Sequence, residues 1–283
     1  MVEKMYKAWM ITTVILLFWC PESFALFESK GLSARYLSLG GGCTALSGEP
    51  STMAANPGGL GFYSRKGIQS SWSQLFNLRE LSSGDFYFIY PLKRFLWTKS
   101  LTFGLGLNIF GQPDYYQESK ISLALGHRMQ DALSIGVSVK YMKVSFPAPY
   151  PSFSTIGFDS GVLIRIQDKA QIGGAIENLN KPQVVKGSED IPRIWHLGFA
   201  VFAFEDVILT VDLVKDSEFE PQLKFGQEIR ISKKLALRFG MATEPVTYSV
   251  GTGFEWENIK MDYAFMSHPS LAGSHKVSIC FEW

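Results

Sequence analysis

The sequence predicts an all-β protein, a transmembrane antiparallel β-barrel of about fourteen strands with a short N-terminal plug folded into its lumen. Three observations support this prediction. The chain opens on the pattern of a signal peptide. Most of the chain beyond that segment alternates between apolar and polar residues with a period of two. The final segment alternates as well, and it ends on an aromatic residue, Trp283.

Residues 1–25 have the features of a signal peptide. Two lysines precede an apolar run, and the small residues Ser23 and Ala25 are spaced as a signal-peptidase site requires. The run is too short to cross a membrane as a helix, which needs about twenty apolar residues. We therefore expect cleavage after Ala25, a plug over residues 26–64 and a barrel over residues 65–283.

Composition narrows the options further. Hydrophobic residues make up 46% of the chain, yet no apolar stretch after Leu26 reaches about eighteen residues, which excludes transmembrane helices from the mature chain. The net charge of +1 shows none of the excess of basic residues that is typical of proteins that bind nucleic acid. Cys43 and Cys280 remain after cleavage, which is too few for a disulfide-built scaffold, and the sequence leaves open whether they bond.

The alternation is clearest over residues 101–110, where every second residue is apolar and the residues between are mostly small or polar. A soluble β-sandwich would show the same pattern, so the connections between strands must decide between a sandwich and a barrel. Short turns such as Glu205-Asp206 alternate with longer connections such as residues 180–193, as in outer-membrane barrels. Residues 91–98 are the exception, because they are long where a short turn is expected.

Aromatic residues gather near the predicted strand ends, where membrane interfaces favour them. They are Trp72, Tyr90, Trp97, Tyr141, Trp195, Trp256 and Trp283. The alternating segment that ends on Trp283 is typical of the carboxy-terminal signature by which bacterial barrels are recognised for assembly.

The plug is the least strand-like part of the mature chain. Its motif consists of Gly40, Gly41, Gly42, Asn56, Pro57, Gly58 and Gly59. The first three glycines permit positive φ and a close backbone approach, and the Asn-Pro-Gly sequence predicts a tight turn before the first strand. A phosphate-binding loop is excluded, because no lysine follows at the required spacing. We expect the plug to fold inside the barrel, with Asn56 bonded to buried backbone groups.

Charged residues of the parity opposite to the apolar face are expected to point into the lumen. The bases are Lys140, Arg165, Lys224, Arg230, Arg238 and Lys260, and the acids are Asp159, Glu177, Asp212, Glu228, Glu255 and Asp262. A balanced set predicts a self-neutralising network against the plug rather than an ion-selective pore, which favours one sign of charge. Ordinary solvated lumen residues would fit the same pattern.

Catalysis is not expected from this sequence. Among the histidines only His196 is placed in the lumen by parity, and no Gly-x-Ser-x-Gly motif accompanies it. No cluster of histidine, cysteine and carboxylate has metal-ligand spacing, so neither a metal nor another cofactor is expected.

Seven segments carry a resemblance to a known family. They are residues 34–42, 44–46, 54–60, 172–179, 192–198, 210–214 and 261–265. In these segments the chain resembles the PorV/PorQ-like outer-membrane proteins, within the wider fourteen-stranded group typified by the FadL transporters. That family commonly has alanine after the Asn-Pro pair, where this chain has Gly58. The chain is also shorter than the usual members.

The resemblance implies a barrel in the cell outer membrane that anchors or delivers exported proteins at the cell surface. Its partners would be outer-membrane lipid and either exported proteins or proteins of the type IX secretion system. The alternative is FadL-like transport of hydrophobic small molecules across the outer membrane, with such a molecule as ligand. Neither alternative involves nucleic acid.

Overall fold

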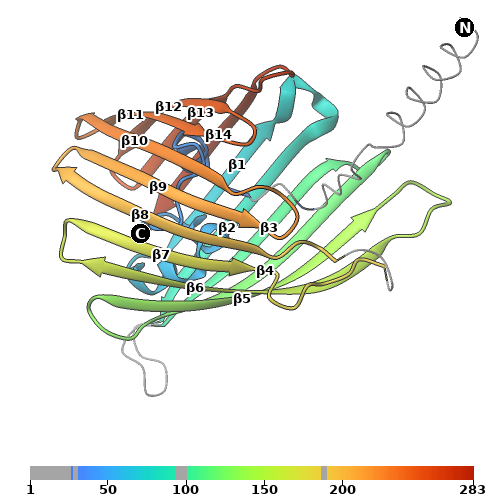
Figure 1. The fold of residues 1–283 in the computed structure, drawn as a ribbon, viewed down its shortest axis with the longest axis horizontal. Coiled ribbons are helices and arrows are strands. Elements are labelled where there is room, and N and C mark those ends of the chain that lie inside the picture. Colours follow the sequence, from blue (N-terminus) through green and yellow to red (C-terminus); the bar gives the residue numbers. More distant parts are fainter. Residues whose placement is uncertain (1–26, 28–30, 93–100, 186–189) are drawn as a thin grey trace, which may run out of the picture.

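The structure is a computed structural model that describes residues 27, 31–92, 101–185 and 190–283. Fourteen antiparallel strands close into a barrel, because each pairs with its neighbour in sequence and β1 also pairs with β14 (Figure 1). The strands are β1 (Gly67–Gln74), β2 (Ser82–Leu92), β3 (Leu101–Gln112), β4 (Tyr116–Arg128), β5 (Leu133–Ser145), β6 (Phe153–Ile166), β7 (Ala170–Glu177), β8 (Ile194–Phe204), β9 (Val207–Asp216), β10 (Gln222–Ser232), β11 (Leu235–Ala242), β12 (Thr247–Trp256), β13 (Ile259–Met266) and β14 (Ser274–Glu282).

The predicted barrel and its lumen plug are confirmed. The predicted signal peptide, Trp97 and most of the exceptional connection at residues 91–98 lie outside the described residues.

The two faces of each strand differ as the alternation predicts. In β9 the apolar residues Leu209, Val211 and Leu213 are exposed on the outside, while Thr210 and Asp212 are buried inside. Other strands follow the same rule, so the outer wall is an apolar surface that only lipid can cover. The chain therefore lies in the outer membrane.

The connections differ between the two ends of the barrel. The end at which β1 begins and β14 finishes has the short turns between β4 and β5, β6 and β7, β8 and β9, β10 and β11, and β12 and β13. The opposite end has mostly longer connections, from residues 113–115 between β3 and β4 to residues 178–193 between β7 and β8. The exception at the first end is the connection of β2 to β3, residues 93–100. Because short turns face the periplasm in such barrels, we refer to these as the periplasmic end and the outer end.

The outer rim is uneven. β5 and β6 pair as far as Val144 with Phe153. The pairing of β6 with β7 begins only at Ser160 with Ile176, and β7 ends at Glu177. The wall is therefore lower over β7 and β8 than over β5 and β6.

The plug consists of α2 (Ala34–Ser38), α3 (Thr52–Ala55), the 3-10 helix η1 (Pro57–Phe62) and the irregular chain between them. Figure 1 shows these elements in blue inside the barrel. Tyr36, Leu39 and Leu46 of the plug form a buried apolar cluster with Leu163 and Ala200 of the wall.

Two further 3-10 turns, η2 (Leu75–Asn77) and η3 (Arg79–Leu81), lie between β1 and β2. Among the described residues, no helix has the length and apolar character needed to span a membrane.

Candidate functional site

Asn56 joins the turn of the plug to the barrel wall. Its Nδ2 donates to the carbonyl oxygens of Thr44 (2.8 Å) and Val162 (3.0 Å), and its Oδ1 accepts from the N–H of Gly58 (2.9 Å). The residue is completely buried. These bonds satisfy backbone groups that water cannot reach, so one side chain fixes both the fold of the plug and its position against β6.

Glycines on the wall allow the plug to lie directly against the strands. A Cβ atom on Gly136 would collide with the carbonyl of Pro57, and one on Gly240 would collide with the backbone of Gly40. Gly40 also has a φ of +67°, which glycine adopts without strain. Glycine is therefore required on both sides of this contact.

Asp212 holds the segment that follows the three glycines. Its Oδ2 accepts hydrogen bonds from the N–H groups of Cys43 (3.0 Å) and Thr44 (2.8 Å). A carboxylate with two backbone donors ties the plug to β9, roughly as a side chain caps a helix. Cys43 and Cys280 are both buried free thiols. They therefore form no disulfide bond with each other, which the sequence had left open.

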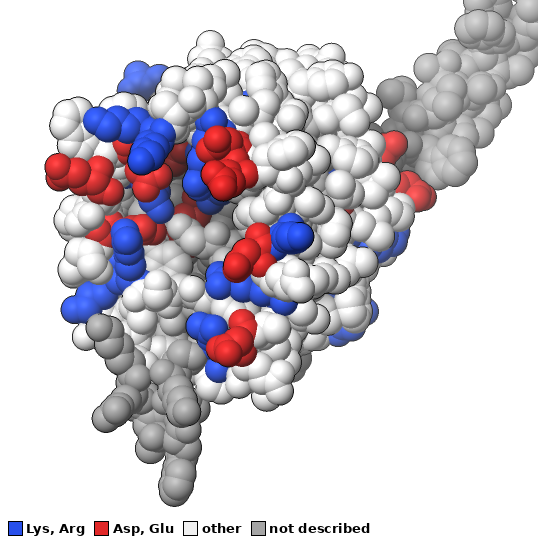
Figure 2. Space-filling model, turned by 90° about the vertical axis from the view of Figure 1, so that its left-hand side faces the viewer, with Lys and Arg blue, Asp and Glu red and all other residues white. Residues whose placement is uncertain are grey.

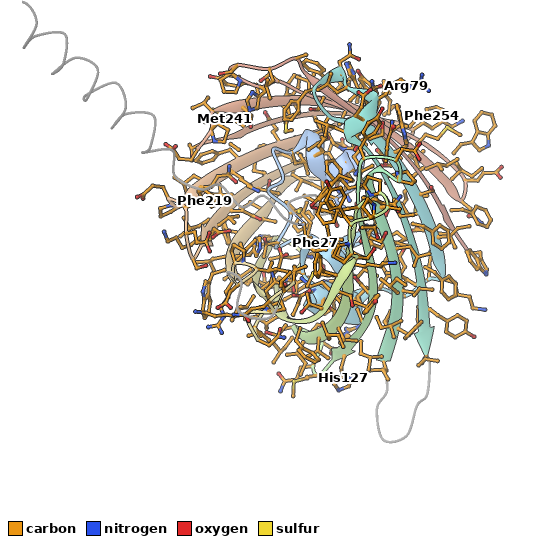
Figure 3. The ribbon with its side chains drawn as sticks, turned by 90° about the vertical axis from the view of Figure 1, so that its right-hand side faces the viewer. Phe27, Arg79, His127, Phe219, Met241 and Phe254 are labelled. Carbon is orange, nitrogen blue, oxygen red and sulfur yellow. The ribbon has the colours of Figure 1, made fainter. Side chains whose placement is uncertain are left out.

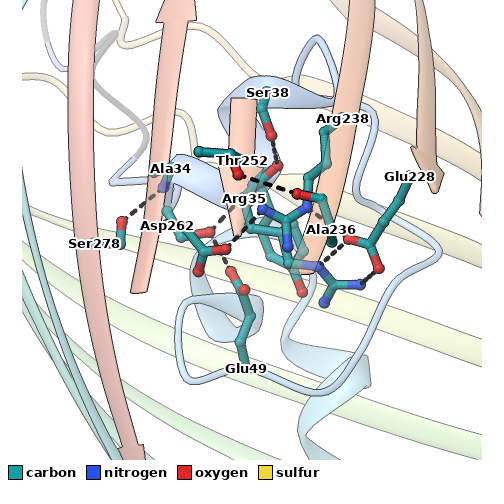
Figure 4. A network of polar contacts seen from close by, with 12 residues as sticks. Ala34, Arg35, Ser38, Glu49, Glu228, Ala236, Arg238, Thr252, Asp262 and Ser278 are labelled. Atoms are coloured by element: carbon teal, nitrogen blue, oxygen red, sulfur yellow. Dashed lines mark hydrogen bonds and ion pairs between the residues drawn. The ribbon is translucent and has the colours of Figure 1, made fainter. Parts of the chain in front are cut away.

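The third attachment is a chain of charges between α2 and strands β10, β11 and β13 (Figure 4). Arg35 of the plug donates to both carboxylate oxygens of Glu228, at 2.7 and 3.1 Å. Arg238 bridges Glu228 and Asp262, at 2.7 Å each. Because Glu228 and Arg238 are buried, removing one member would leave a buried charge without its partner.

Glu49 adds a third carboxyl to these two guanidinium groups. It accepts hydrogen bonds from the hydroxyls of Ser33 and Ser51 and is buried in the plug. Burial raises the pKa of Glu49, and the nearby Arg35 opposes that shift. A protonated Glu49 would balance the cluster, because two bases would then face two ionised acids.

A second charged cluster lies nearer the outer end. Lys140 Nζ is 2.8 Å from Asp159 and 3.9 Å from Glu177. His196 Nε2 is 2.8 Å from the other oxygen of Glu177. This cluster joins β5, β6, β7 and β8 at the height where the rim steps down.

A cavity of about 650 Å³ opens between this cluster and the outer loops. Its apolar lining includes Phe27, Met142, Ile191, Pro192, Val214 and Phe219. Its polar lining is equally extensive and consists of Lys120, Lys140, Glu177, Asn178, Asp216, Glu220, Gln222 and Glu244. On β5, Gly136 contacts the plug whereas Lys140 and Met142 line the cavity further toward the outer end. The plug therefore lies on the periplasmic side of the cavity.

Figure 3 looks at the outer end and shows Phe27 near the middle of the mouth and Phe219 at its margin. The opposite end has a different surface. There Lys and Arg side chains alternate with Asp and Glu around a hollow (Figure 2), whose lining includes Arg230, Lys233, Lys260 and Glu255. The outer entrance thus combines apolar and charged residues, among them Asp216, Glu220 and Glu244, whereas the periplasmic hollow is lined mainly by charged residues.

The structure divides the predicted lumen charges between separate contacts. Glu228, Arg238 and Asp262 form one cluster, and Lys140, Asp159 and Glu177 form another, instead of one continuous network. Arg165 lies over the ring of Phe62, at 3.9 Å from its centroid, and Lys224 lies beside Gly41. Arg230 and Glu255 are exposed near the periplasmic mouth, and Lys260 pairs with Glu282 at 3.0 Å.

Several residues that form buried ion pairs in the structure were not predicted from the sequence. Lys276 and Asp85 form a buried ion pair at 2.6 Å, and both have the inward parity that identified the others. Arg35 and Glu49 lie in the plug, where no periodicity exists to indicate their direction.

No family model matches the chain, and no curated protein matches it. Among solved structures, a FadL homologue from Pseudomonas aeruginosa is similar with a TM-score of 0.64 and 11% identity, covering 88% of this chain and 98% of that one. The toluene transporter TodX from P. putida is similar with a TM-score of 0.66 and 10% identity, covering 90% of this chain and 99% of that one. The chain has the FadL-type barrel fold. Identities this low show the fold alone.

Proposed function

We propose that the protein takes hydrophobic small molecules from outside the cell into the lumen cavity, and that the plug controls their further passage. The observation that carries this proposal is the position of the cavity. It has apolar walls such as Met142, Val214 and Phe219, and it opens at the outer end. Small-molecule sites are usually concave with apolar walls, and this cavity has such walls together with charged residues at its base and its outer rim.

The solved structures with this fold support the same reading, because they include a transporter of toluene and a channel for monoaromatic hydrocarbons. Anchoring or delivery of exported proteins, the role of PorV/PorQ-like proteins, has no comparable support from the comparisons. The plug favours a gated route over an open pore, because it is held at Asn56, Asp212 and Arg35.

The proposal predicts that the cavity limits uptake. Val214 points into the cavity and is buried, whereas its neighbour Leu213 faces the outside and is exposed. Val214→Trp should narrow the cavity and lower the uptake of radiolabelled toluene or hexadecane by cells that produce the protein. Leu213→Trp adds the same side chain to the lipid-facing wall, where aromatic residues are tolerated.

Heat-modifiable migration on gels would show that both variants form the closed barrel. Uptake that is equal in the two variants and the parent protein would overturn the proposal.

A further inference from the structure

The seam between β1 and β14, at which the barrel closes, differs from the other strand pairs. Residues 67–74 of β1 pair with residues 275–282 of β14, so the seam joins the first strand of the barrel to the last. The other neighbouring strands are consecutive in the sequence. In a hairpin the connection brings the two strands together and fixes their register. The seam has no connection of this kind, so other contacts must bring its strands together.

The seam's own side-chain bonds lie in its outer and middle parts. Lys276 of β14 reaches across β1 to Asp85 of β2 at 2.6 Å, and both residues are buried. The hydroxyls of Ser71 on β1 and Ser278 on β14 are 2.9 Å apart. These bonds hold the part of the seam that is nearer the outer end.

The plug supplies the bonds of the periplasmic part. The N–H of Ser51 donates to Oε1 of Gln69 on β1 at 2.8 Å, and the hydroxyl of Tyr63 donates to Glu282 on β14 at 2.5 Å. Gly67 of β1 is opposite Glu282, and a Cβ atom added to it would lie 2.8 Å from the hydroxyl of Tyr63. The plug therefore lies directly on the seam and is bonded to both of its strands.

The helix α2 attaches the plug to the last strands of the barrel. The N–H of Ala34 donates to the hydroxyl of Ser278 on β14 at 2.7 Å, and Arg35 is bonded to Glu228 on β10. The helix also packs on β11, β12 and β13. At its other end the plug continues through η1 into β1. One segment is thus covalently continuous with the first strand and bonded to the last.

This arrangement lowers the entropic cost of closing the barrel. Glu282 follows its partner Tyr63 by 219 residues in the chain. Bringing together two strands that are so far apart in sequence costs conformational entropy, which increases with the length of the loop. When the plug is docked on β11 to β14, β1 is already held beside β14, and only a short segment remains to be ordered.

We propose that the plug has a second function, in assembly: it brings β14 to β1 and so closes the barrel. In this it replaces the connection that joins the other pairs of neighbouring strands. The proposal does not depend on transport, because it concerns only the contacts of the plug with the strands that meet at the seam.

The test measures how fast the full chain, unfolded in urea, closes after dilution into detergent micelles. Heat-modifiable migration on gels follows closure. Tyr63→Phe removes one hydroxyl of the plug and changes no residue of either strand. Closure should slow about fivefold, the factor that corresponds to one hydrogen bond missing from the rate-limiting state. Tyr36→Phe is the matched control and should close at the parent rate, because its buried hydroxyl bonds Thr52 inside the plug.

A second pair of variants keeps the test decisive if Tyr63→Phe folds poorly. Ser278→Ala removes the acceptor of Ala34 on β14, whereas Ser134→Ala removes a hydroxyl on β5 that donates to the plug at Gly58 (2.6 Å). Both serines are buried. Ser278→Ala should slow closure and Ser134→Ala should not. Ser71→Ala, which loses only the bond to Ser278, should slow closure less than Ser278→Ala does.

The proposal is overturned if the seam variants close as fast as their controls. It is also overturned if the controls slow closure as much as the seam variants, because the plug would then stabilise the wall in general without bringing its two ends together.

Discussion

Asn56→Ala removes the side chain that joins the plug turn to the wall. Three hydrogen bonds are lost, which leaves the carbonyls of Thr44 and Val162 and the N–H of Gly58 buried without this partner. Each such group costs about 1–3 kcal/mol. Some water will enter the vacated space, so we expect the free energy that holds the plug closed to fall by about 3–6 kcal/mol in total.

Two measurements report the effect. Conductance of the variant in planar bilayers shows whether the lumen opens, and the temperature of unfolding shows the lost stability. Asn180→Ala is the matched control, because Asn180 also bonds the backbone of β6, at Ile156 (2.8 Å) and Phe158 (3.1 Å), but it is exposed at the outer rim. The control should lose less than about 1 kcal/mol and should not conduct, since water replaces its bonds.

Equal unfolding temperatures of the two asparagine variants, with neither conducting above the parent protein, would contradict this expectation. That result would mean that the plug is held elsewhere, at Asp212 or Arg35, and that Asn56 contributes only to the local turn.

Two further variants test the charged attachment of the plug. Glu228→Gln leaves the partly buried guanidinium of Arg35 and the buried guanidinium of Arg238 without their shared carboxylate. Unfolding should therefore cost about 3–5 kcal/mol less, measured by thermal unfolding against Glu255→Gln at the exposed periplasmic mouth. Equal melting temperatures of the two variants would contradict this. Glu49→Gln tests the raised pKa of Glu49. A raised folded pKa contributes stability that is present below the ordinary carboxyl value and is lost as pH rises through the folded pKa. The parent protein should therefore lose stability relative to Glu49→Gln between about pH 4 and the raised value, and a difference that stays constant with pH would contradict it.

The period of two was enough to predict the barrel wall. It placed Arg238, Glu228 and Asp262 inside, because a strand turns alternate side chains to opposite faces whatever the partner strand is. It could not predict which of them meet, because that depends on the register between strands. The register brings Glu228 opposite Arg238 and leaves Arg165 against Phe62 instead of a carboxylate.

The plug and the cavity depend on information that periodicity does not contain. Asn56 was predicted to bond buried backbone, but its partner Val162 lies 106 residues away and becomes known only once the plug is placed. The cavity depends on the paths of outer connections, which bring Ile191 and Phe219 over the lumen. Those connections have no regular pattern, so their course follows from tertiary packing alone.

The proposed function requires the closed barrel to admit a hydrophobic molecule into the cavity on the outer side of the plug. A crystal structure of the protein soaked with a bromoalkane measures this directly, because the anomalous signal of bromine locates the ligand. We expect a bromine site inside the lumen, among Met142, Val214 and Phe219, and a weaker one in Val214→Trp. Bromine found only on the lipid-facing wall, with the cavity free of it at saturating ligand, would contradict the proposed function.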